Sequence, residues 1–148
     1  MAPLRRPLTI ASLVLAMVGL ALSAYLSYAH YNLDALACGT GSCELVQTSE
    51  YSEMYGVPIA LFGVAMFVVV IAGIILRERR SETADLVSTA ILAILLTAIL
   101  YWIYLTYLEI NVIHAVCQWC VASSLVTLTL LIVEAIRWYR NYTSLGEE

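Results

Sequence analysis

The chain has 148 residues, of which 62% are hydrophobic and only 12% are charged, and its formal net charge is -4. Its mean hydropathy of +0.89 is higher than that of an ordinary water-soluble domain of this size. It contains no lysine, which argues against a nucleic-acid partner. We therefore expect an all-α integral membrane protein with one membrane domain over residues 1–148, in contact with lipid.

The first apolar run covers residues 8–31 and is long enough to cross a bilayer. Arg5 and Arg6 precede it, and it ends in tyrosines typical of a membrane interface: Tyr25, Tyr28 and Tyr31. The alternative is a cleaved signal peptide, because residues 21–23 are small enough for a cleavage site. The run is longer than the apolar part of most signal peptides, so we favour a transmembrane helix.

A polar loop over residues 32–56 follows, with Cys38 and Cys43 and several acidic residues but no arginine. Its second half, residues 43–55, has few turn-forming residues and can hold a short helix lying on the membrane. The loop would then cover one end of the helices as a cap.

Three further spans are predicted at residues 57–76, 86–108 and 117–138. Pro58 would lie in the first turn of the second span, where proline is tolerated. Residues 109–116 are a short connection that can continue as helix. The expected fold is a four-transmembrane-helix bundle with a loop and half-helix cap.

The arginines indicate the orientation of this bundle. All seven lie in the terminal segments or between the second and third spans: Arg5, Arg6, Arg77, Arg79, Arg80, Arg137 and Arg140. By the positive-inside rule both termini are cytoplasmic, so all four cysteines are extracytoplasmic. Paired thiols there meet an oxidising compartment, in which disulfides form and persist.

The last span opens with Cys117-Gln118-Trp119-Cys120. In a helix this spacing puts both cysteines on one face, close enough for a reversible disulfide. Exposed amides at a helix N-terminus favour the thiolate, which is the reactive form. This pattern predicts a redox-active dithiol.

A loop pair and a pair at the bundle mouth can form a relay by thiol–disulfide exchange. Cys38 and Cys43 would take electrons from a protein dithiol, and Cys117 and Cys120 would pass them to a lipid-soluble quinone. Two alternatives stay open: a tetraspan scaffold protein with a static loop disulfide, and a zinc site made from His114, Cys117, Cys120 and a loop cysteine. Nothing else in the chain suggests metal binding, and we expect no metal.

Three other ionisable residues are interpreted from their positions. Glu109, the sole carboxylate at the outer end of the third span, can manage protons for a quinone, but we favour a solvated boundary residue. His30 and His114 are expected to be interfacial side chains and not catalysts. Glu134 lies three residues before Arg137, and we expect these two to pair.

Several motifs together resemble a known family. Ser42-Cys43, then Ser49, Tyr51, Gly56 and Pro58, and finally Cys117-Gln118-Trp119-Cys120 opening the last span, occur in this order. The pattern is similar to the vitamin K epoxide reductase family in its bacterial and archaeal form, over about residues 8–138. The resemblance implies an oxidoreductase in the bacterial or archaeal cytoplasmic membrane, with a four-helix bundle around a quinone of the ubiquinone or menaquinone type.

By the same resemblance, Cys38 exchanges with a thioredoxin-like or DsbA-like protein outside the membrane, Cys43 exchanges with Cys117, and Cys120 faces the quinone. The expected pocket residues are Ser49, Phe62, Met66, Leu105 and Ser124. We expect a standalone member without a fused thioredoxin-like domain. A DsbB-like enzyme performs the same reaction, but its CxxC lies in the first loop and not in the last span.

Two departures from the family pattern affect these expectations. The loop spacing of four residues between Cys38 and Cys43 is short for the family, which bears on how far Cys38 can reach. Ser124 stands where animal members have a tyrosine that contacts vitamin K, so epoxide reduction is not expected.

Overall fold

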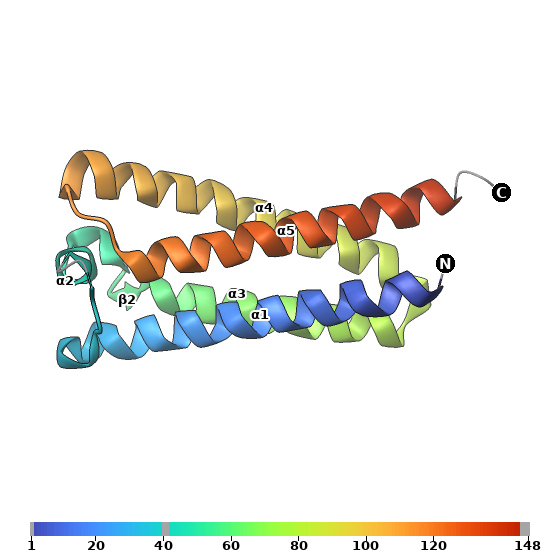
Figure 1. Ribbon diagram of the computed structural model, residues 1–148, viewed down its shortest axis with the longest axis horizontal. Coiled ribbons are helices and arrows are strands. Elements are labelled where there is room, and N and C mark those ends of the chain that lie inside the picture. The colour runs from blue at the N-terminus through green and yellow to red at the C-terminus, as the bar shows by residue number, and fades with distance from the viewer. Residues whose placement is uncertain (1, 40–41, 146–148) are drawn as a thin grey trace.

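The structure, a computed structural model, describes residues 2–39 and 42–145. Four long helices lie side by side as an up-and-down bundle (Figure 1). They are α1 (Ala2–Tyr31), α3 (Ile59–Arg79), α4 (Ala84–Leu108) and α5 (Gln118–Leu145). The first and last described residues lie at one end of the bundle, and the cap lies at the other (Figure 1).

The predicted membrane bundle is confirmed. Among the described residues, four helices are long and apolar enough to cross a membrane. Large apolar side chains point outward along each helix, as lipid contact requires; examples are Ile10, Val69, Leu100 and Ile132.

The helix bounds differ from the predicted spans at several ends. α1 begins at Ala2 and runs through Pro7, whose missing N–H removes only one hydrogen bond close to the helix start. α3 begins at Ile59, directly after Pro58, so the expectation that Pro58 lies in the first turn is wrong. α5 continues to Leu145, beyond the predicted end at residue 138.

The core lies in the middle of the bundle. α1 packs against α3 and α5, and α4 packs against α3 and α5. The buried core side chains come from all four helices: Ala16, Phe67, Val70, Ile74, Ile91, Leu95 and Leu130. A Cβ atom at Gly19 would lie 2.2 Å from Cζ of Phe67, so glycine there lets the aromatic ring reach the α1 backbone.

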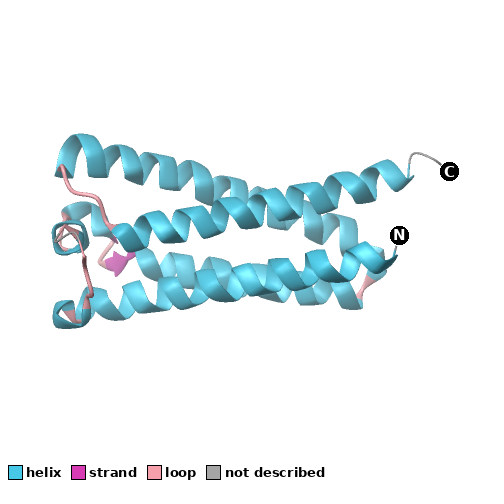
Figure 2. Cartoon of the chain, in the orientation of Figure 1, coloured by secondary structure: helices cyan, strands magenta, loops and turns pink. Residues whose placement is uncertain are grey.

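Short elements between α1 and α3 build the cap (Figure 2). They are η1 (Leu33–Ala35), α2 (Cys43–Gln47), η2 (Glu50–Ser52), β1 (Glu53–Met54) and β2 (Val57–Pro58). The two strands pair antiparallel, Glu53 with Pro58 and Met54 with Val57. Tyr55 and Gly56 join them with φ angles of 54° and 77°, the conformation that a two-residue hairpin turn requires. The predicted cap therefore holds a half-helix, α2, and a small hairpin.

Two short helical segments connect the later helices. η3 (Ser81–Thr83) links α3 to α4, and η4 (Glu109–Ile113), a π-helical segment, continues α4 at the cap end. His114 then adopts a left-handed conformation with φ 56°, which ends the helix. The chain turns back over four residues to begin α5.

Ion pairs hold the opposite end of the bundle, which we call the arginine end. Arg77 of α3 bonds both carboxylate oxygens of Glu134 of α5, at 2.5 and 3.2 Å, and both side chains are buried. Arg137 pairs with Glu78 and also donates to Thr9. The expectation that Glu134 pairs with Arg137 is wrong, because Glu134 points into the bundle toward α3 and not along its own helix.

Candidate functional site

All four cysteines meet at the cap end. Cys43 begins α2, and Cys117 directly precedes α5. Cys43 and Cys117 belong to one buried apolar cluster, and Cys38 and Cys120 pack against that cluster. Two pairs that are 74 residues apart in the sequence therefore share one site, as the relay hypothesis requires.

The two pairs differ in redox state but share the same pattern of exposure. Cys38 and Cys43 form a disulfide with a Cα–Cα distance of 6.1 Å, whereas Cys117 and Cys120 are free thiols. Cys43 and Cys117 are fully buried, and Cys38 and Cys120 are partly exposed. Each pair thus has one sulfur inside the cluster and one that an outside reactant can approach.

The loop segment before Cys38 is fixed to the bundle by two aromatic residues. Nε1 of Trp119 donates to the carbonyl oxygen of Ala37 at 2.7 Å, and the backbone N–H of Ala37 donates to the Tyr25 hydroxyl at 2.9 Å. That hydroxyl in turn donates to the carbonyl of Ala35 at 3.1 Å, and the Tyr25 and Trp119 rings meet edge to face at 5.0 Å. Trp119, which lies between the inner cysteines in the sequence, therefore holds the loop segment that carries the outer disulfide.

Cys117 is prepared for nucleophilic chemistry. A hydrogen bond from the Cys120 side chain lowers its pKa to about 7, with backbone N–H groups of Cys120 and Trp119 adding to the effect. These amides belong to the first turn of α5, where N–H groups lack helical partners. Burial, which is the second-largest influence, and the nearby Glu109 act in the opposite direction. The thiolate expected at a helix start is thus favoured just ahead of the helix.

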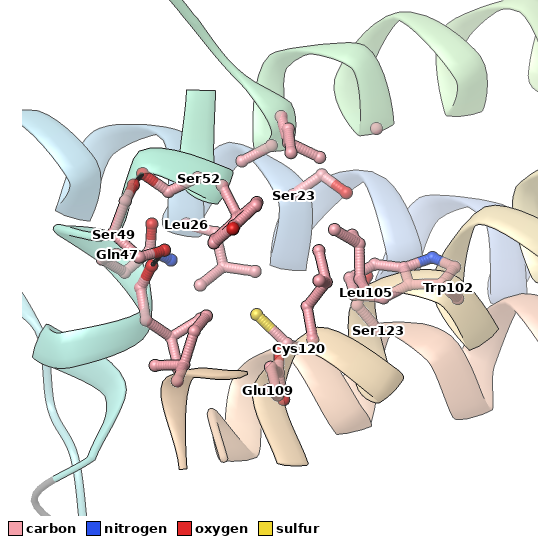
Figure 3. A pocket seen from close by; sticks show the side chains of 17 residues that line it. Ser23, Leu26, Gln47, Ser49, Ser52, Trp102, Leu105, Glu109, Cys120 and Ser123 are labelled. Atoms are coloured by element: carbon pink, nitrogen blue, oxygen red, sulfur yellow. Dashed lines mark hydrogen bonds between the residues drawn. The ribbon is translucent and has the colours of Figure 1, made fainter. Parts of the chain in front are cut away.

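A cavity opens between the cap and the four helices, and Cys120 points into it (Figure 3). Its walls are mainly apolar, with Leu26, Trp102 and Leu105 among them. A few polar side chains interrupt these walls: Ser23, Gln47, Ser49, Ser52, Glu109 and Ser123. An apolar cleft with a small number of polar groups suits a small, mainly apolar ligand.

Gln47, a cap residue that lines this cavity, contacts a histidine that lies outside the cavity wall. Nδ1 of His30 lies 3.4 Å from Oε1 of Gln47, and its Nε2 lies 2.9 Å from a carboxylate oxygen of Glu53. With its amide oxygen turned toward His30, Gln47 has its NH₂ group left to donate elsewhere. His30 is therefore a structural link between α1 and the cap.

The predicted pocket residues divide into two groups. Ser49 and Leu105 line the cavity, but Phe62, Met66 and Ser124 are not among its wall residues. Phe62 is half exposed on α3, Met66 packs on the mid-bundle core, and Ser124 donates to the carbonyl of Val121 in its own helix. A role for these three in quinone binding stays a prediction.

Several wall residues were not anticipated from the sequence. Ser123, Gln47 and Trp102 line the cavity, and Glu109 does so while only 5% exposed. The expectation that Glu109 is a solvated boundary residue is therefore wrong: η4 carries the helix past it and the following turn covers it. A carboxylate at the end of an apolar span is unusual, and this was the sequence signal that could have identified Glu109 as a site residue.

The zinc alternative gains no support from the geometry. Across residues 2–39 and 42–145, no three His, Cys, Asp or Glu side chains come together as metal ligands would. Both loop cysteines are also joined to each other.

Comparison with known families agrees with the motif resemblance. The family model described as the vitamin K epoxide reductase family matches residues 10–135. That segment holds all four cysteines and most of each long helix. The site described above, two cysteine pairs at one end of a membrane bundle, fits a membrane thiol oxidoreductase. The chain therefore belongs to the vitamin K epoxide reductase family.

Proposed function

We propose that this protein oxidises a thioredoxin-like or DsbA-like protein outside the cytoplasmic membrane of a bacterium or archaeon and passes the electrons to a membrane quinone. It would thereby support disulfide bond formation. The observation that carries the proposal is the packing of all four cysteines in one cluster, with the inner pair reduced and Cys120 in the cavity wall. The position of the arginines, at the end of the bundle opposite the cysteines, supports an extracytoplasmic cap.

Electrons would enter at Cys38. Cys38 is partly exposed, while Cys43 is fully buried. A partner thiolate can therefore attack only Cys38, and Cys43 leaves as a thiolate inside the cluster. The partner's second thiol then displaces Cys38 and completes the partner disulfide.

The second exchange takes place between the buried sulfurs. The Cys43 thiolate attacks Cys117 of an inner disulfide, and Cys120 leaves. Cys38 then attacks Cys43, which re-forms the outer disulfide and releases Cys117. The outcome is an outer disulfide with an inner dithiol, which is the combination described above.

The inner dithiol would meet the quinone in the cavity. A quinone takes up two electrons and two protons, which matches the oxidation of one dithiol. Ser123 and the Gln47 amide supply hydrogen-bond donors for its carbonyl oxygens, and Leu26, Trp102 and Leu105 supply apolar contacts. Ser49 lines the same space, and its hydroxyl donates to the carbonyl of Val46. Cys120 is the inner cysteine that lines this space, so it faces the acceptor.

A single-turnover experiment tests the proposal. The protein is reduced, freed of reductant and mixed with a short-chain quinone while the quinone absorbance is followed. We expect wild type and Cys38→Ala to reduce the first equivalent of quinone at the same rate, because both keep the inner pair. Cys117→Ala and Cys120→Ala should show no reduction above background, and equal activity in them would refute the mechanism.

Reaction with a reduced thioredoxin-like protein gives the complementary result. Cys38→Ala should now be inactive, because the exposed sulfur is gone. In Cys120→Ser, before any partner is added, the Cys117 thiolate can attack Cys43 of the outer disulfide and release Cys38, so this variant should accumulate a Cys43–Cys117 disulfide that peptide mass mapping detects. A scaffold with a static loop disulfide would give no mixed disulfide in any variant.

A further inference from the structure

Glu109 is a buried carboxyl group at the active end of the bundle for which the relay above has no use. It is the first residue of η4 and is 5% exposed. Its carboxylate accepts a hydrogen bond from the backbone N–H of Cys117, and its side chain lies beside Cys120 (Figure 3). Carboxyl groups are costly within membrane segments and commonly mark proton pathways.

Glu109 also lies between two spaces. It lines the inner cavity together with Cys120. It lines a second, open hollow on the outer side, where His114, Gln118 and Ser42 are its neighbours. Among the described residues that line the two spaces, Glu109 is the one they share. The other titratable groups around it are Tyr51 and Cys120 on the inner side, His114 on the outer side, and Cys117 at its carboxylate.

A count of protons shows why a carrier is needed. Oxidation of the inner dithiol supplies two electrons, and a quinone takes up two protons with them. Because the pKa of Cys117 is lowered to about 7, some of the molecules carry a Cys117 thiolate at neutral pH before oxidation. The Cys120 thiol then provides one proton, and the second has to come from another group.

We propose that Glu109 carries this second proton from the outer hollow into the cavity; the inference rests on the proposed function. When the Cys117 thiolate and the Cys120 thiol join in a disulfide, two electrons and the Cys120 proton are released. Glu109 adds its own proton, so the acceptor receives two electrons and two protons. The Glu109 carboxylate regains a proton from the outer hollow when the inner pair is reduced again and the Cys117 thiolate re-forms.

Charge repulsion between Glu109 and Cys117 links the proton transfer to the oxidation step. Glu109 and the Cys117 thiolate repel each other when both are charged, so a thiolate at Cys117 favours a protonated Glu109. Disulfide formation removes the thiolate charge. Glu109 thus becomes able to release its proton in the same step in which the electrons leave.

Quinone reduction by Glu109→Gln tests the carrier in single turnovers of the reduced protein. Glutamine keeps an oxygen to accept the Cys117 N–H but cannot transfer a proton. We expect the rate to fall about 100-fold and to decrease further with pH above about 7, while wild type varies little. Glu109→Asp, which keeps the carboxyl group, should recover most of the rate, and Glu44→Gln, at an exposed cap carboxylate, should match wild type. A Glu109→Gln variant with the wild-type rate and pH profile would overturn the inference.

Infrared difference spectroscopy provides a readout without quinone. The inner dithiol of a Cys38→Ala/Cys43→Ala protein is oxidised with diamide, which takes up the two electrons and two protons. We expect a protonated-carboxyl band to disappear on oxidation, and this change to be absent from Glu109→Gln and present in Glu44→Gln. No such band change with Glu109 intact would overturn the carrier. If wild type reduces no quinone at all, the proposed function fails, while this spectrum still reports whether Glu109 loses a proton.

Discussion

The cap end and the arginine end of the bundle are held together by different forces. At the cap end, short elements rest on the helices through hydrogen bonds that involve Tyr25, Trp119 and His30, and they surround a cavity. At the arginine end, the buried Arg77–Glu134 pair joins α3 to α5 directly, and Arg77 also donates a hydrogen bond to the hydroxyl of Ser88 of α4. The reactive end is thus assembled from weak, replaceable contacts, whereas the opposite end holds the helices in place.

This difference matters for the chemistry that we propose. Disulfide exchange between the two cysteine pairs requires sulfurs to approach and separate by small movements of the cap. A bundle fixed at its far end permits such movement without loss of helix packing. The comparison predicts that changes at the arginine end reduce stability and leave the redox steps intact. Changes at the cap end should slow the redox steps and leave stability largely intact.

The largest effect is expected for Glu134→Ala. It leaves Arg77 buried without its carboxylate, which typically costs about 3–5 kcal/mol. Thermal unfolding in detergent should show a large decrease in stability, while quinone reduction per folded molecule remains at the wild-type value. Glu82→Ala, an exposed carboxylate of η3 at the same end, is the control and should unfold like wild type.

A double variant shows whether the buried charge is the cause. Arg77→Met/Glu134→Leu removes both charges and should recover most of the lost stability, because an apolar pair can replace a buried ion pair. If Glu134→Ala costs less than about 1 kcal/mol, the pair does not hold this end together and the comparison between the two ends fails.

An intermediate effect is expected for Trp119→Phe at the cap end. Phenylalanine keeps the ring against Tyr25 but loses the hydrogen bond to the Ala37 carbonyl, worth about 0.5–1.5 kcal/mol. The transfer from the outer to the inner cysteine pair should slow by about three- to tenfold, measured by rapid quenching and mass analysis of thiols. Trp138→Phe, which alters a stacked pair with Tyr142 at the other end, should not change the rate; equal rates in both variants would show that the loop needs no such anchor.

Features set by one-dimensional patterns could be predicted from the sequence. The four spans follow from apolar length. The two cysteine pairs lie at the same end of the bundle because two membrane crossings, α3 and α4, separate them in the sequence. The grouping of the arginines at one end follows from the same topology. None of these three features depends on how side chains pack.

Features set by helix rotation and backbone irregularity could not. Ser124 was expected at the pocket, but Ser123 lines it, because one position along a helix turns a side chain by about 100°. Glu109 was expected in solvent and is buried, since that depends on the π-helical segment and the left-handed His114 that follow it. Glu134 pairs across the bundle and not with its neighbour Arg137, a choice that only the packing of α3 against α5 determines.

The smallest effect concerns a single proton at the cap end. Because the Cys120 side chain is the main cause of the lowered Cys117 pKa of about 7, Cys120→Ala should move that pKa up toward its ordinary value. Thiolate absorbance in a Cys38→Ala/Cys43→Ala background measures it: wild-type Cys117 loses its thiolate as the pH falls through about 7, whereas in Cys120→Ala the thiolate is already lost at higher pH. Thr129→Ala, on an exposed position of α5, should leave the titration unchanged. If the midpoint stays near 7 without Cys120, the backbone amides at the start of α5 are sufficient to activate Cys117.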